Sequence, residues 1–164
     1  MYWLFFIKYY LMNTLKQKAI ALGLCADFQK SWSDDLVGMY KRGVSWCMKH
    51  KYPTLEDMLP YDKELADNDV HNSRLVNLIL TNDTYILNDC KGEIEIDDFN
   101  VSGLYVALNS IIDINVKDNS ILTIECYDNA ILRVSVDENA VCSVWKYGNS
   151  VVQVLKGNVK IIQK

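Results

Sequence analysis

Residues 118–136 read DNSILTIECYDNAILRVSV, and this stretch states nearly the same pattern twice at a spacing of ten residues. The spacing continues in both directions, and five units keep one register. They are NSIIDINVKD from residue 109, NSILTIECYD from 119, NAILRVSVDE from 129, NAVCSVWKYG from 139 and NSVVQVLKGN from 149. The blocks DCKGEIEIDD from 89 and FNVSGLYVAL from 99 are degenerate copies. A repeat of fixed period therefore organises the second half of the chain, in about seven units.

Each unit alternates apolar and polar residues, as a strand with one buried face does. The residues at position four are Ile112, Leu122, Leu132, Cys142 and Val152. The residues at position six are Ile114, Ile124, Val134, Val144 and Val154. Position two is Ser or Ala and suits a crowded corner, while the Asn at position one follows Asp, Glu or Gly in most units. We expect these Asn residues to adopt positive φ and to stack in a hydrogen-bonded ladder.

Two architectures use such strands, an antiparallel meander and a parallel solenoid. A meander with two-residue turns would exchange the inward and outward positions at every turn, and the sequence never exchanges them. Identical corners stack coil upon coil only in a solenoid, which the repeat favours. Position nine alternates Tyr with other residues, at Tyr127 and Tyr147, which indicates two units or about twenty residues per coil. A three-sided coil of about thirty residues remains the alternative.

Position three is also aliphatic, although its parity points it outward. These residues are Ile111, Ile121, Ile131, Val141 and Val151. They lie either at a corner or under the N-terminal helices, or they form an exposed stripe that binds a protein partner. Tyr127, Trp145 and Tyr147 form a candidate aromatic surface for sugar rings, although aromatic residues are also common in plain sheet packing.

No pattern in the sequence indicates a catalytic, cofactor or metal site. Asp113, Glu125 and Arg133 are the outward groups that a polysaccharide-active β-helix would have to bring together, and ordinary solvated charges are the better explanation of them. His50 and His71 stand outside any metal-ligand spacing. We therefore expect no catalytic residues, no cofactor and no metal.

The N-terminal half has helical spacing. We expect an apolar extension over 1–12, a helical domain over 13–74 and the solenoid over 75–164, with residues 62–73 as a polar linker. Met12 is either the natural start, or the extension is an aromatic helix or strand that packs on the body or a partner. Helices are predicted over about 13–22, 26–32 and 34–51, and a capping box at Thr54 and Asp57 opens a short helix that Pro60 ends.

In these N-terminal helices, Gly23 suits a helix C-terminus and Ser33 an N-cap. Phe28 and Trp32 are expected to be buried, and Leu15, Ala19 and Leu22 share one helix face.

Charge and cysteine content limit the class of protein. The net charge is −4, and residues 74–164 hold twelve Asp/Glu against eight Lys/Arg, which argues against nucleic-acid binding. Five scattered cysteines without a CxxC pair indicate a reducing, cytoplasmic setting. Cys126 and Cys142 are expected to be buried and inert. The apolar start is too short to span a membrane.

The stretches LKQKAIALGLCADFQKSW from residue 15 and GVSWCMKHKYPTLEDML from residue 43, followed by β-repeats, resemble small uncharacterised proteins of gut bacteria and their phages. The resemblance implies an α+β chain, a small helical domain followed by a parallel β-solenoid, and it brings no activity with it.

The function that we expect is a non-enzymatic protein-interaction or structural module. A polysaccharide-binding or polysaccharide-active β-helix is the alternative, with carbohydrate as the ligand. A protein partner or self-association through the position-three stripe is expected. Lys156, Lys160 and Lys164 are expected to keep the C-terminal edge from polymerising head-to-tail.

Overall fold

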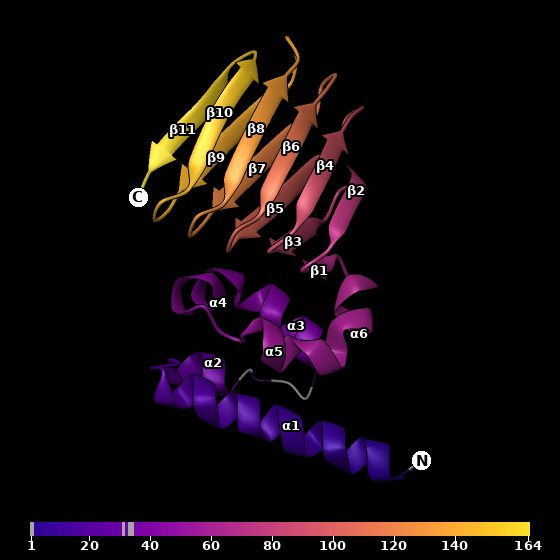
Figure 1. The fold of residues 1–164 in the computed structure, drawn as a ribbon, viewed down its shortest axis with the longest axis vertical. Helices are drawn as coiled ribbons and strands as arrows, with labels where there is room; N and C mark the ends of the chain where they lie inside the picture. The colour runs from indigo at the N-terminus through magenta and orange to yellow at the C-terminus, as the bar shows by residue number, and fades with distance from the viewer. Residues whose placement is uncertain (1, 31, 33–34) are drawn as a thin grey trace. The chain divides into compact units, whose positions relative to one another are not determined.

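A computed structural model describes residues 2–30, 32 and 35–164, with side chains described from residue 9 onward. The chain divides into two compact units, residues 1–68 and residues 69–164. The first unit is helical and the second consists of β-strands (Figure 1). The expected α+β organisation, helices followed by a parallel β-solenoid, is confirmed.

The N-terminal unit consists of short helices after one long one. They are α1 Tyr2–Ala21, α2 Ala26–Lys30, α3 Leu36–Arg42, α4 Val44–His50, α5 Leu55–Met58, the 3-10 helix η1 Leu59–Tyr61 and α6 Asp62–Ala66.

Helix α1 joins two segments that the sequence analysis separated. It runs without a break through Met12, so the expected extension and the expected first helix are one element. Leu15 and Ala19 are buried as expected, but Leu22 is exposed because the helix ends one residue before it. Gly23 follows with φ of +89°, the left-handed conformation expected at a helix end.

The helix expected over residues 34–51 is two helices, α3 and α4, because the helix is interrupted at Gly43. A Cβ atom at this glycine would lie 2.2 Å from the Phe28 ring, so the close approach of that ring requires a glycine. Phe28 and Trp32 are half-buried rather than buried. The N-cap of α3 is Asp35, whose carboxylate accepts the N–H groups of the first turn. The N-cap expected at Ser33 lies outside the described residues.

The capping box at the start of α5 is confirmed. Thr54 Oγ1 accepts the N–H of Asp57 at 3.2 Å, and the Asp57 carboxylate accepts the N–H of Thr54 at 3.2 Å. The Lys18 ammonium lies 2.9 Å from the same carboxylate and ties α1 to this turn. Helix α5 ends before Pro60, as expected.

The second unit has eleven strands in two parallel sheets. They are β1 Val70–Asn72, β2 Leu75–Leu80, β3 Thr84–Asn88, β4 Lys91–Ile96, β5 Val101–Ala107, β6 Ile111–Val116, β7 Ile121–Cys126, β8 Ile131–Val136, β9 Val141–Lys146, β10 Val151–Lys156 and β11 Val159–Gln163. The odd-numbered strands form one sheet in the order β1-β3-β5-β7-β9-β11, and the even-numbered strands form the other in the order β2-β4-β6-β8-β10 (Figure 1).

Consecutive ten-residue units therefore alternate between the two sheets, and one coil contains two units. Ile111 pairs with Ile131, and Ile121 pairs with Val141, each twenty residues apart. The two-unit coil is confirmed over the three-sided one, and the parallel pairing excludes the meander. Residues 62–73 are not the expected polar linker, because they contain α6 and β1. Strands β1 to β3 precede the first recognised repeat, since their turns lack the Asn-Ser signature.

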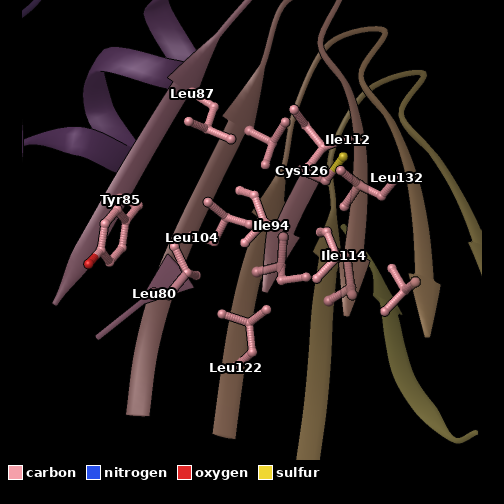
Figure 2. Close-up of a cluster of buried hydrophobic side chains, with 14 of the residues drawn as sticks. Leu80, Tyr85, Leu87, Ile94, Leu104, Ile112, Ile114, Leu122, Cys126 and Leu132 are labelled. Atoms are coloured by element: carbon pink, nitrogen blue, oxygen red, sulfur yellow. The ribbon is translucent and has the colours of Figure 1, made fainter. Parts of the chain in front are cut away.

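The inward positions of both sheets fill a continuous apolar core (Figure 2). Ile114, Ile124, Val134 and Val144 are at most 1% exposed, as the alternation predicted. Val154 is 43% exposed, so the prediction was wrong for the last unit. Strand β10 pairs only with β8 and shifts register between Val154 and Lys156, which leaves this side chain without a covering coil.

The corners of the coil confirm one expectation and correct another. Ser110, Ser120 and Ala130 are fully buried, as expected of small residues at position two. Positive φ occurs one residue before the Asn, for example +53° at Asp118 and +57° at Asp128, and not at the Asn itself.

The expected Asn ladder is weakly developed. The structure records one amide contact, from Asn129 Nδ2 to Asn109 Oδ1 at 3.5 Å, which is beyond the usual range for a hydrogen bond. The corners are held instead by carboxylates and by backbone hydrogen bonds. Leu108 N–H donates to Asp128 Oδ2 at 3.2 Å, whereas the contact from Asp98 N–H to Asp118 Oδ2, at 3.4 Å, is also longer than usual.

Candidate protein-interaction surface

The position-three residues do not form one stripe. Ile111, Ile131 and Val151 stack on the even-numbered sheet, and Ile121 and Val141 stack on the odd-numbered sheet. The reason is the two-unit coil, which sends alternate units to opposite sheets. The candidate stripe is therefore two separate rows, one at each corner of the coil.

The row on the odd-numbered sheet is longer than the sequence indicated, because Val101 pairs with Ile121. Val101, Ile121 and Val141 are 55%, 41% and 55% exposed, and we call them the apolar row. Backbone hydrogen bonds hold its rungs, from Ile121 N–H to Asn100 O at 2.9 Å and from Val141 N–H to Ser120 O at 2.9 Å. Paired strands lie about 4.8 Å apart, so the row spans about 10 Å along the solenoid.

A row of carboxylates runs beside the apolar row. Asp98, Asp118 and Glu138 each precede a member of the apolar row by three residues, all three are exposed, and we call them the acidic row. Phe99 lies between the two rows in sequence and is 78% exposed. The acidic row lies in the corners at residues 97–100, 117–120 and 137–140, and the apolar row directly follows them. We call these corners, together with the apolar row, the first corner.

The cations nearest the first corner are engaged with other carboxylates. Lys117 forms an ion pair with Glu95, and Lys156 Nζ lies 2.7 Å from Asp137 Oδ1. The hydrogen bond to Glu95 raises the pKa of Lys117, and the hydrogen bond from Lys156 lowers the pKa of Asp137. Among the described residues, both of these lysines pair with carboxylates outside the acidic row.

The second corner, at residues 107–110, 127–130 and 147–150, is different in kind. The residues equivalent to the acidic row are Leu108, Asp128 and Gly148, so a single carboxylate remains there. At this corner Ile111 and Ile131 are half-buried and Val151 is 42% exposed. The feature that distinguishes the first corner is its row of three exposed carboxylates beside the aliphatic residues.

The candidate aromatic surface is partly assembled. The rings of Tyr127 and Tyr147 stack with centroids 4.5 Å apart and planes at 4°, as the alternation at position nine predicted. Tyr127 is buried and its hydroxyl donates to Glu125, so its ring is unavailable to a ligand. Burial also raises the pKa of Tyr147, and the Glu125 carboxylate raises it further. Trp145 is half-buried and leaves a small aromatic area exposed.

The three charged groups considered for glycoside chemistry do not meet. Arg133 binds both oxygens of Asp113, Nε to Oδ1 at 2.5 Å and Nη2 to Oδ2 at 2.7 Å, on the even-numbered sheet. Glu125 lies on β7 in the other sheet. The shallow depression beside the ion pair, about 350 Å³, has Glu93 and Leu155 on its wall. Because Asp113 is held by Arg133, the depression brings no free pair of carboxyl groups together.

The cysteines and histidines are placed as follows. Cys126 and Cys142 are buried free thiols, and burial raises their pKa to about 11 and about 12. Cys25 is exposed. The His50 ring stacks on Trp46 at 4.3 Å. Within the part of the chain that the structure describes, no three His, Cys, Asp or Glu residues gather in a way that could hold a metal ion.

Sequence reasoning missed Asp98, Phe99 and Val101 as surface residues because their unit lacks the Asn-Ser start. Their placement follows from the twenty-residue offset alone, since Val101 stands two units before Ile121. The twenty-residue offset is present in the sequence, and together with the coil size it places Val101 in the same row as Ile121.

The fold places the chain in a structural class, the small parallel β-solenoids with two sheets, here preceded in the sequence by a helical unit. No family model, curated protein or solved structure matches the chain, and the resemblance to proteins of gut bacteria and phages gains no support. Among the described residues, no helix has both the length and the apolar character needed to cross a membrane.

Proposed function

We propose that this chain is a non-enzymatic protein-interaction module, with the β-solenoid as a rigid scaffold and its first corner as the binding surface. The observation that carries the proposal is the apolar row. Its three side chains are about half exposed, although the next residue in each of their strands is buried. A contiguous exposed apolar patch with a polar rim is typical of interaction sites.

The scaffold supports this role because the row is positioned by backbone hydrogen bonds from coil to coil. Its members sit at the first residues of β5, β7 and β9, where a corner brings the chain into the sheet. The spacing of the rungs is therefore fixed by strand pairing and not by flexible side chains. A preorganised surface loses little conformational entropy on binding.

The test is a selection of short peptides from a display library against the intact protein. The peptides are then assayed against a variant with Val101, Ile121 and Val141 replaced by Ser. A control replaces three apolar residues on the even-numbered strands that are more exposed than the apolar row, Leu75, Ile79 and Leu155. We expect the selected peptides to lose binding to the first variant and keep binding to the control. Equal binding to both variants, or the absence of any enriched peptide, would reject the proposal.

The sugar-binding alternative rests on Trp145 and Tyr147, which remain partly exposed on β9 and at its end. Titration with soluble oligosaccharides, followed by the difference in tryptophan fluorescence between the wild type and Trp145→Phe, tests it. A saturable change that the variant lacks would place carbohydrate ahead of protein as the ligand.

A further inference from the structure

The acidic row predicts the sign of the charge on the partner. Resting on the proposed function, we infer that the first corner binds a basic, partly apolar segment of another protein, whose cations face the acidic row while its apolar side chains cover the apolar row. Strand pairing sets the spacing of the apolar row, and each member of the acidic row stands three residues before a member of the apolar row. The two rows therefore present two parallel tracks, one apolar and one negative, along the same corner.

The acidic row is suited to an external cation because the internal ones are committed. Lys117 pairs with Glu95 and Lys156 pairs with Asp137. Asp98 and Asp118 are both held at positive φ, and the Asp118 carboxylate accepts the N–H of Asp98. The positive φ and this long contact concern Asp98 and Asp118, and neither involves a cation.

The second corner provides an internal comparison. It has the same backbone arrangement and the same aliphatic position three, but a leucine and a glycine replace two of the three carboxylates. Three carboxylates therefore stand beside the exposed aliphatic residues at the first corner, against one carboxylate at the second, where Val151 is 42% exposed. Complementary charge across an interface directs encounter and excludes wrong partners, so the first corner favours a basic partner.

A second copy of the chain is a poor occupant. A two-fold axis across the rows places apolar row on apolar row and acidic row on acidic row, which costs like-charge repulsion. An axis parallel to the rows and midway between them places each apolar row on an acidic row and buries unpaired carboxylates. An axis along the apolar row pairs the apolar rows alone and supplies no cation to either acidic row. The net charge of −4 acts in the same direction.

The probes are three synthetic peptides of one length, with valine alternating with lysine, glutamate or serine. In an extended peptide the alternation places the charged and apolar side chains on opposite faces, one for each row. Binding is followed by fluorescence anisotropy with the intact protein. We expect the lysine peptide to bind most tightly, and its affinity to fall as salt shortens the Debye length from about 30 Å to about 3 Å.

The decisive variant is Asp98→Asn, Asp118→Asn and Glu138→Gln. It should bind the lysine peptide about tenfold more weakly, because exposed ion pairs contribute modestly and three are lost. The matched control, Asp27→Asn, Glu56→Gln and Glu93→Gln, changes the net charge equally at exposed sites elsewhere and should bind as the wild type does. Circular dichroism checks that both variants remain folded.

The outcomes separate this inference from the proposed function. If selected peptides need the apolar row but are neutral or acidic, and ignore salt and the acidic-row variant, the basic partner is wrong and the interaction module stands. If both triple variants weaken the lysine peptide equally, binding reflects net charge alone and the inference is overturned. If no peptide of any charge binds and none is enriched, both are rejected. Self-association of this chain through the first corner would likewise overturn the inference of a basic partner.

Discussion

Val134→Ala and Val154→Ala form a matched pair, because both valines stand at position six of their units and on neighbouring strands of one sheet. Val134 is 0% exposed and lies on β8, between β6 and β10, whereas Val154 is 43% exposed on the edge strand β10. The first change removes two buried carbon atoms, worth about 1.6 kcal/mol at ~0.8 kcal/mol each, and leaves a cavity besides. We expect a total loss of about 2–3 kcal/mol. The second change should cost less than about 1 kcal/mol, since nearly half of the side chain already contacts solvent.

Urea unfolding followed by far-ultraviolet circular dichroism measures both changes. The comparison requires that the dependence of the unfolding free energy on urea concentration be the same for both variants and the wild type, because local fraying would alter it. Val144→Ala, at a fully buried position on the opposite sheet, serves as the control and should behave as Val134→Ala does. Equal losses at Val134 and Val154 would refute the argument that a covering coil determines the burial of these positions.

Three further outcomes follow from single residues. Thiol labelling of the native protein should modify exposed Cys25 rapidly and Cys126 only on unfolding, since burial raises the pKa of Cys126 to about 11; rapid labelling of both would contradict the buried core. Burial raises the pKa of Asp57, but hydrogen bonds from α1 and from the capping box lower it more, so the net shift is downward. Asp57→Asn should therefore lower the free energy of unfolding by about 1 kcal/mol at neutral pH. The difference from the wild type should disappear as the pH falls below about 4 and through the lowered pKa of Asp57. A difference that stays constant with pH would show that the ionised carboxylate is not its cause. Gly157→Ala should destabilise the solenoid more than Gly148→Ala, because both have positive φ but only at Gly157 would the new Cβ lie 2.1 Å from a backbone oxygen; equal losses would refute the close approach.

The sequence alone was sufficient for the repeat, its parallel pairing and most of its core. Alternation at Ile114 and Ile124 identified the inward face because side-chain direction in a strand depends only on parity. The capping box at Thr54 was readable because it depends on four consecutive residues. The break at Gly43 was not readable, because it depends on the ring of Phe28, which packs there from another helix.

The candidate surface was half-predicted for a similar reason. Aliphatic residues at position three were correctly seen as outward, and Ile121 and Val141 are exposed. Their neighbours Ile111 and Ile131 were assigned to the same stripe because a ten-residue repeat conceals which units share a sheet. Only the size of the coil separates the two rows, and although the alternation of Tyr127 and Tyr147 indicates two units per coil, the single stripe did not take this into account.

The most direct test of the account compares the two rows within one protein. One variant, Ile121→Ser with Val141→Ser, alters the row beside the carboxylates, and its counterpart, Ile111→Ser with Ile131→Ser, alters the row at the opposite corner. Both keep the net charge and both remove two aliphatic side chains at position three. Binding of the alternating lysine-valine peptide should be lost in the first variant and retained in the second. Equal retention or equal loss in the two variants would contradict the claim that the first corner is the binding surface.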